Sequence, residues 1–268
     1  MLSSVLSVAQ DTAFEFQEYK NKGKFFAYWG WNRVEYSKSD ISFKGDNYNF
    51  TLKDVAAKDK VKAFALDPYF HPLKITIPQT NMRIGYFFTE NYSVSIGVDH
   101  MKYVMYNNRM GTITGAINTG GAFDGIYEND QLLVSEDFLT FEHTDGLNYV
   151  NVEIDRFDSI DEFLNFRVRG IDLAITEGIG LGLMYPKTNT KLLGKERHDD
   201  FNVAGWGASA HLGINITIFT HFFIQSNIKV GYINMNNIRT TNDRRDSASQ
   251  HVTFVERTIL FGGRFCLF

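Results

Sequence analysis

The sequence predicts an all-β protein: a closed antiparallel transmembrane β-barrel of eight strands with long extracellular loops. Three observations support this fold class. First, apolar side chains alternate with small or polar ones over many segments, which is the period of a strand with two different faces. Second, aromatic residues make up 15% of the 268 residues, yet the mean hydropathy is −0.22. Third, no run reaches the roughly 18 apolar residues of a transmembrane helix. A barrel reconciles these facts, because only every second residue of a strand faces lipid.

The clearest alternation lies in residues 79–105, which flank the polar turn Thr89-Glu90-Asn91 and predict a long β-hairpin. The apolar face would carry Met82, Ile84, Tyr86, Phe88, Tyr92, Val94, Ile96 and Val98. Small and polar residues, with Arg83 and Asp99 among them, occupy the opposite face. The short turn is typical of the periplasmic side of a membrane barrel.

Seven further segments complete the prediction. The eight strands are expected at residues 24–36, 79–88, 92–105, 147–157, 171–186, 201–219, 222–233 and 250–268. Long loops are expected at 37–78, with a hairpin around Gly45-Asp46, at 107–146, at 187–200, and between the last two strands. The other connections are shorter, and the one at 158–170 is expected to contain a helical turn. Three short turns on one side and four long loops on the other are typical of a membrane barrel.

The chain is predicted to be one barrel domain over residues 10–268. Residues 1–9 are interpreted as a residual signal peptide, because a short apolar run ends in Ser7-Val8-Ala9, a small-residue cleavage site. The alternative is a short ordered N-terminal segment. A net charge of −4 argues against a nucleic-acid binder. The single cysteine, Cys266, excludes an intramolecular disulfide.

The last strand ends in FGGRFCLF, with Phe268 at the terminus. This ending and the strand pattern resemble the small eight-stranded outer-membrane proteins of Gram-negative bacteria, of the OmpA, OmpX, OmpW and PagP kind. The segments WGWNRVEYSKSDISFKG, GVDHMKY and GLMYPKTNTKLLGKER are also similar to uncharacterised barrels of Bacteroidota. The resemblance implies a location in the bacterial outer membrane, among its lipid and lipopolysaccharide. It also implies recognition by the barrel-assembly machinery through the strand that ends at Phe268.

The interior of an eight-stranded barrel is just wide enough to be filled by side chains. Alternation directs seven charged residues into it, namely Arg83, Asp99, Glu153, Asp155, Lys229, Glu256 and Arg264. Enclosed charges must be paired, because an isolated buried charge costs several kcal/mol. The sequence therefore predicts a charge network that plugs the lumen, with a polar relay or narrow ion path as the alternative.

Two residues are weak catalytic candidates. Ser209 and His211 lie on one face of a predicted strand, an arrangement that suggests a nucleophile and a base. Lipid A-modifying barrels provide a precedent for an acyltransferase or deacylase, but a hydrogen-bonded interior histidine is the favoured interpretation of His211. The acidic residues of the 107–146 loop lack the spacing of a calcium loop. No cofactor and no metal site is predicted.

Two charges fall on the lipid-facing side, Glu177 and Arg257. An outward Arg at mid-membrane costs about 2–4 kcal/mol. Three explanations are open: a β-bulge that shifts the phase, a position near the membrane interface, or contact with another protein.

These observations favour a non-enzymatic protein with a structural or surface-interaction role. Within this class, an accessory subunit of a larger outer-membrane complex is also considered. A lipid A-modifying enzyme and a narrow channel for small solutes are the other functions considered. A soluble lipocalin-like barrel is the rival fold. It would bury the apolar face, including Trp206, Ile214, Ile228 and Phe261, inside the barrel.

Overall fold

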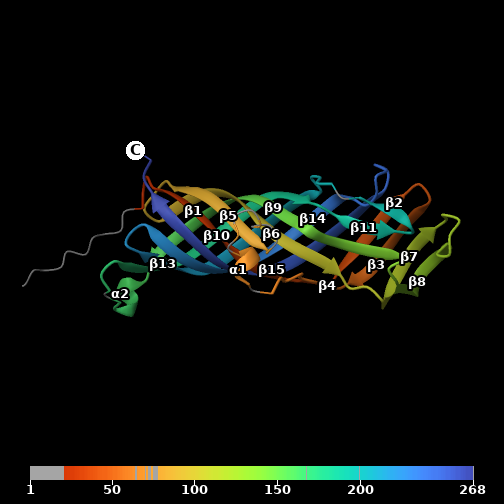
Figure 1. The fold of residues 1–268 in the computed structure, drawn as a ribbon, viewed down its shortest axis with the longest axis horizontal. Coiled ribbons are helices and arrows are strands. Elements are labelled where there is room, and N and C mark those ends of the chain that lie inside the picture. Colours follow the sequence, from red (N-terminus) through yellow and green to blue (C-terminus); the bar gives the residue numbers. More distant parts are fainter. Residues whose placement is uncertain are drawn as a thin grey trace, which may run out of the picture.

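The computed structural model describes residues 21–267, except 64, 70, 72, 73, 75–77, 167 and 199. The predicted signal peptide and Phe268 therefore lie outside the described residues. Eight long strands form the barrel: β1 (Phe25–Tyr36), β5 (Thr80–Phe87), β6 (Tyr92–Met105), β9 (Leu139–Ser159), β10 (Ile171–Pro186), β13 (Gly205–Ile218), β14 (Phe222–Arg239) and β15 (Ser247–Phe265). Each pairs antiparallel with the next, and β15 pairs back with β1, so the described strands close a ring (Figure 1). The predicted fold class is confirmed.

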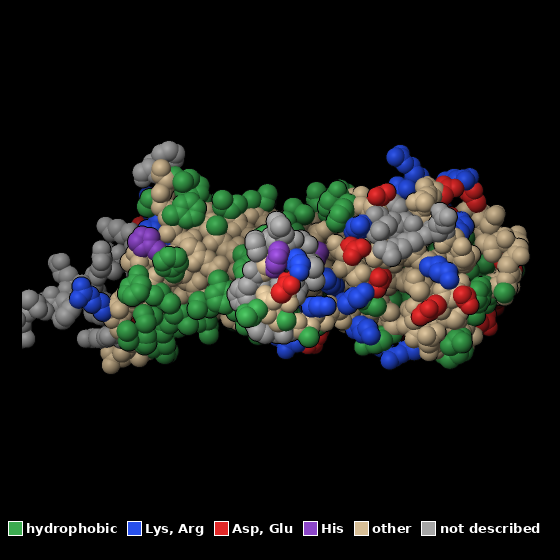
Figure 2. Space-filling view, in the orientation of Figure 1, with side chains coloured by type: hydrophobic (Ala, Val, Ile, Leu, Met, Phe, Trp, Pro, Cys, Tyr) green, Lys and Arg blue, Asp and Glu red, His purple; other side chains and the backbone are tan. Residues whose placement is uncertain are grey.

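The two faces of the ring follow the predicted alternation. Trp206, Ile214, Ile228 and Phe261 are exposed outward by 43%, 55%, 58% and 42%. The lipocalin-like rival is therefore wrong. Figure 2 shows hydrophobic side chains gathered over one end of the molecule and charged side chains over the other. Among the described residues, no helix is long and apolar enough to cross a membrane.

The short connections lie at the apolar end. Residues 88–91 join β5 to β6, and residues 219–221 join β13 to β14. The longer connection contains the helical turn α2 (Asp161–Leu164), as predicted. These turns share one end of the ring, which we call the inner end. The charged end of the molecule is the outer half.

The outer half differs from the prediction. Much of the chain expected to be loop is strand: β2 (Ser39–Gly45), β3 (Tyr48–Val55), β4 (Ala57–Lys58), β7 (Arg109–Ile117), β8 (Gly125–Val134), β11 (Asn189–Leu192) and β12 (Lys195–His198). Only the hairpin of β2 and β3 was expected. Above the ring, β15 pairs with β2, and the sheet continues through β3 and β7 to β8, while β11 adds to β9. The expectation of irregular loops at 107–146 and 187–200 is wrong.

A large hydrophobic core fills this outer half. Ile41, Phe43, Phe50, Ile113 and Phe141 are among its members, each at most 1% exposed. The missed strands alternate between this core and solvent, and many of the outward positions, such as Glu128, Asp130 and Gln131, are polar or acidic, so the sequence has the appearance of a solvated loop. Outside the ring, the short helix α1 (Leu66–Tyr69) brings Tyr69 to 5.6 Å from the ring of Trp31.

Candidate functional site

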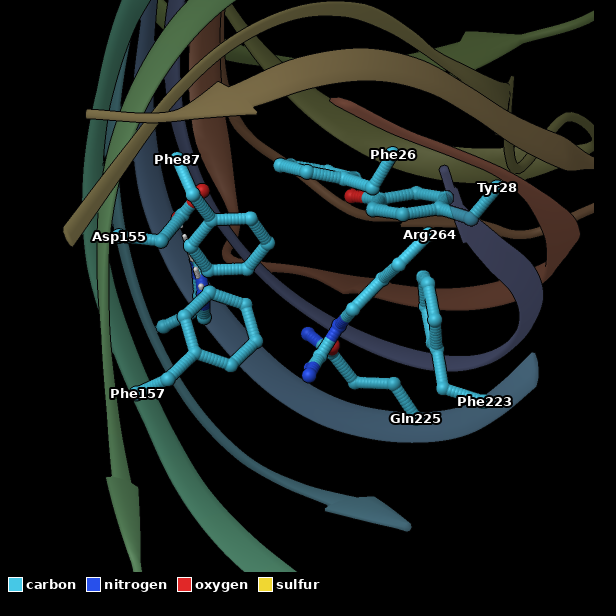
Figure 3. Close-up of a pocket in the computed structure, with 9 residues that line it drawn as sticks. Phe26, Tyr28, Phe87, Asp155, Phe157, Phe223, Gln225 and Arg264 are labelled. Atoms are coloured by element: carbon cyan, nitrogen blue, oxygen red, sulfur yellow. Dashed lines mark ion pairs between the residues drawn. The ribbon is translucent and has the colours of Figure 1, made fainter. Parts of the chain in front are cut away.

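The interior of the barrel is layered along its axis. The innermost layer is a collar of four phenylalanines from four strands, Phe26, Phe87, Phe157 and Phe223. The guanidinium of Arg264 lies among three of these rings, 5.2 Å from the centroid of Phe87 and 5.5 Å from those of Phe157 and Phe223 (Figure 3). Cation–π contacts of this kind are strongest where the cation is desolvated, and Arg264 is 3% exposed.

The second layer is a charge cluster with Lys229 at its centre. The Lys229 ammonium donates to a carboxylate oxygen of Asp99 and, at 2.8 Å, to Oε1 of Glu153. Oε2 of Glu256 lies 3.7 Å from the same nitrogen. Lys229 is 2% exposed, and the three carboxylates are no more exposed than that. One cation therefore serves three acids that come from three different strands.

Arg83 ties the same cluster together from β5. Its guanidinium lies 2.9 Å from Oε1 of Glu153 and 3.7 Å from Oδ1 of Asp99, and it donates to Asn151 at 2.7 Å. Asn81 donates to Asp99 at 2.7 Å and to Glu256 at 3.0 Å. Two asparagines thus complete the cluster.

Asp155 sits beside this cluster, against His211 rather than against a lysine or arginine. Its Oδ1 lies 3.5 Å from Nε2 of His211. Its Oδ2 accepts from the hydroxyls of Ser93 and Ser95 at 3.3 and 3.4 Å. The two partners come from β9 and β13, and they meet across Gly178 of the intervening strand β10, because a Cβ at Gly178 would collide with both.

The structure brings six of the seven predicted lumen residues into this region, and one lies elsewhere. Arg264 does not join the ion pairs around Lys229. It lies in the phenylalanine collar and donates to Oδ1 of Asn21 at 3.0 Å and of Asn215 at 3.2 Å. Alternation identified its face correctly, but the height of a residue along the barrel axis depends on strand register and tilt, which alternation does not supply.

The weak catalytic candidates do not form a nucleophile and base pair. The hydroxyl of Ser209 lies 3.4 Å from the hydroxyl of Tyr149. The ring of His211 lies between Glu153 and Asp155, with Nδ1 3.8 Å from Oε2 of Glu153. His211 is 8% exposed and faces the lumen, so it is not open to a lipid substrate on the outer surface.

Glu177 and Arg257 face outward, as the alternation predicted. The ladders on both sides of each residue run without a register shift at these positions, so the β-bulge explanation is wrong. Each has an outward partner of opposite charge instead. Arg257 donates to Glu35, and Arg156 lies 3.9 Å from Glu177.

The third layer is the hydrophobic core of the outer half. His143 belongs to it, with its ring 4.9 Å from that of Phe141 and 5.8 Å from that of Tyr103. Its Nδ1 lies 3.0 Å from the hydroxyl of Thr188. Burial disfavours the charged imidazole and lowers the pKa of His143 to about 3.

Sequence reasoning missed Asn81, Asn151 and His211 as members of the charged layer. All three have the inward phase of their strands, so the alternation contained the signal. The prediction concentrated on formal charges and left out the amides that bond to them and the imidazole that lies beside them.

The ring is closed, its lumen is polar and charged, and its outer surface is an apolar belt. In hydrocarbon every backbone polar group must be satisfied internally, which only helices and closed barrels achieve. The chain is a transmembrane β-barrel. Its apolar belt faces lipid.

Several solved structures are similar to the chain at low sequence identity. The chain is similar to OprG from Pseudomonas aeruginosa at 13% identity and a TM-score of 0.40, with 92% of this chain and 98% of that chain covered. It is also similar to Ail of Yersinia pestis in complex with sucrose octasulfate, at 9% identity and a TM-score of 0.34, covering 91% and 99% of the two chains. Neisserial surface protein A is matched at 8% identity and a TM-score of 0.30, covering 88% and 96%. No protein-family model and no curated protein matches the sequence.

Proposed function

We propose that this protein is a non-conducting outer-membrane barrel with a structural or surface-interaction role. The observation that carries the proposal is the filling of the lumen by three successive layers. These are the phenylalanine collar with Arg264, the charge cluster around Lys229, and the hydrophobic core of the outer half. An ion would have to cross all three.

The layers leave little free volume. The cavity between the collar and Asp155 has a volume of about 10 Å³, which is the space of a single water molecule. Beyond the charge cluster, the core places large side chains such as Tyr103, Phe43 and Phe138 in full burial. A narrow channel for solutes is therefore disfavoured.

The outer half has an exposed strand edge. Its last strand, β8, pairs with β7 and has no second neighbour among the described strands. Its outward side chains include Ile126, which is 83% exposed, and the acids Glu128 and Asp130. A ten-residue edge strand of this kind can accept a strand from a partner. We propose that partners of this protein, including any larger outer-membrane protein, dock on the outer half.

Conductance measurements test the proposal directly. Purified barrel in planar bilayers is expected to give no single-channel steps, whereas a porin inserted by the same procedure gives them. The double variant Phe223→Ala and Arg264→Ala opens the collar but leaves the other two layers, so it is also expected to stay silent. Reproducible steps from the wild-type barrel would contradict the proposal, and steps from the double variant alone would show that the collar is the only seal.

A further inference from the structure

The lumen cluster contains more negative than positive charge. Four carboxylates, those of Asp99, Glu153, Asp155 and Glu256, are enclosed with the two cations Arg83 and Lys229. Lys229 and Arg83 contact the first, second and fourth of these acids, and neither forms an ion pair with Asp155, so part of the excess negative charge lies at Asp155. Buried charge without compensation is costly, so this side of the cluster favours an additional cation.

Three groups on this side could provide its ligands. One ligand atom from each of Glu153, Asp155 and His211 lies within 4.8 Å of the others, and all three residues are buried. Oδ1 of Asp155 and both ring nitrogens of His211 have no hydrogen-bond partner among the described residues. Asp155 is 5% exposed and His211 8%. Unpaired polar atoms at such depth are expected to have a partner that is not a side chain.

The carboxylates are held so that one oxygen of each is left for a ligand. Oδ2 of Asp155 accepts from Ser93 and Ser95, which leaves Oδ1 toward His211. Oε1 of Glu153 is bound by Lys229 and Arg83, which leaves Oε2 toward the same ring. Hydrogen bonds behind the ligands are what orients the carboxylates of protein metal sites.

The spacing also fits a metal ion better than a direct hydrogen bond. Oδ1 of Asp155 and Nε2 of His211 are 3.5 Å apart, which exceeds the usual length of an N–H···O hydrogen bond. Two ligand atoms about 2.1 Å from one tetrahedral Zn²⁺ lie about 3.4 Å apart. Oε2 of Glu153 lies 3.8 Å from the other ring nitrogen, Nδ1, so it becomes the third ligand only after the Glu153 side chain or the His211 ring turns. The adjoining cavity of about 10 Å³ has room for one water as the fourth.

We propose that this barrel binds one first-row divalent cation, of which Zn²⁺ is the best match, at Glu153, Asp155 and His211. An imidazole with two carboxylates suits such ions and does not suit a soft Cu⁺ site. The ion links β9 to β13 inside the lumen and neutralises the excess negative charge. Gly178 leaves the space that the ion needs, because any side chain there would fill the space between the ligands. The proposal does not depend on whether the lumen conducts.

Metal content of the refolded full-length barrel tests the proposal. The protein is refolded from urea into detergent with ZnCl₂, so that the buried site can load, and is then dialysed extensively before elemental analysis. Wild type is expected to retain one Zn²⁺ per chain. His211→Gln, Asp155→Asn and Gly178→Ala are each expected to retain about a tenth of that or less, since loss of even an outer partner weakens metal sites 10–100-fold. His251→Gln, which changes an exposed histidine on β15, should retain the full amount.

A second measurement keeps the proposal testable if a variant does not fold. Wild type refolded with Co²⁺ in place of Zn²⁺ should show the intense visible absorption of a tetrahedral site with nitrogen and oxygen ligands. Absence of bound metal in wild type would overturn the proposal and leave a water molecule in the cavity. Full retention of Zn²⁺ by folded His211→Gln and Asp155→Asn would overturn it as well.

Discussion

Lys229→Met is the sharpest test of the lumen cluster. The substitution keeps most of the side-chain volume and removes the ammonium that contacts Asp99, Glu153 and Glu256. Lys229 is 2% exposed, so water cannot replace the lost positive charge without opening the barrel. Asp99 and Glu153 then share Arg83. Among the described residues of the cluster, Glu256 keeps only its hydrogen bond from Asn81.

The expected loss in the free energy of unfolding follows from the charge imbalance that the substitution leaves in the folded state. The simplest remedy is protonation of one carboxyl. Removing one partner of a buried ion pair costs about 3–5 kcal/mol. The cost falls as the pH is lowered, because a carboxyl takes up a proton more readily at pH 5.5 than at pH 7.5. Lys229→Met should therefore lower the free energy of unfolding by about 4 kcal/mol at pH 7.5, and by much less at pH 5.5.

Urea-induced unfolding in lipid vesicles, followed by tryptophan fluorescence, measures the loss at both pH values. Lys191→Met is the matched control, because Lys191 lies 3.6 Å from Asp137 in an exposed pair on the outer half. Exposed pairs contribute about 0–1 kcal/mol. A loss below about 1 kcal/mol for Lys229→Met at pH 7.5, or an equal loss at both pH values, would refute the reasoning.

Three further outcomes are expected. Phe50→Ala should destabilise the protein by about 3–5 kcal/mol because it leaves a cavity in the outer core, whereas Phe163→Ala, at a residue 89% exposed, should change little. Ile179→Arg should cost about 2–4 kcal/mol in a bilayer because Ile179 belongs to the lipid-facing belt, and Ile126→Arg, on the outer half, should cost almost nothing. Because the pKa of His143 is about 3 when folded and about 6.5 when unfolded, the unfolded state binds the extra proton between these values. Stability should therefore be complete above pH 6.5 and fall by up to about 1.4 kcal/mol per pH unit below it, a slope that His143→Gln should reduce.

All three comparisons use the same vesicle unfolding assay. Equal losses for the two phenylalanine variants would argue against a packed outer core. Equal losses for the two isoleucine variants would place the belt elsewhere on the barrel. An acid slope that is identical in wild type and His143→Gln would mean that the buried imidazole is not the group responsible.

The strands that cross the membrane were predictable, because one face of each strand lies against lipid and the other faces the polar lumen. Residues such as Arg83 and Ile84 differ sharply in polarity, and a period of two follows at once. The same argument identified the inward phase of Asp99 and Lys229. It could not show that these two residues meet, because they are 130 positions apart and their contact depends on the register of strands across the lumen.

The outer half was less predictable for the converse reason. Its strands are not surrounded by lipid, so their outward positions are polar and the contrast between the faces is weak. The interval that contains Ile113 and Ile117 also contains several glycines and acids, which favoured a loop. The cation site was missed because its ligands come from two strands that meet only across Gly178.

The length of β9 has a mechanical consequence. The strand runs for 21 residues, of which about 11 suffice to cross a bilayer. The remaining ten or so add about 33 Å of strand, measured along the strand at the rise of a β-strand. Because β6, β14 and β15 also continue into the outer sheets, the described part of the outer half is joined to the membrane belt by unbroken strands. A pulling force on this half would therefore pass directly into the barrel wall.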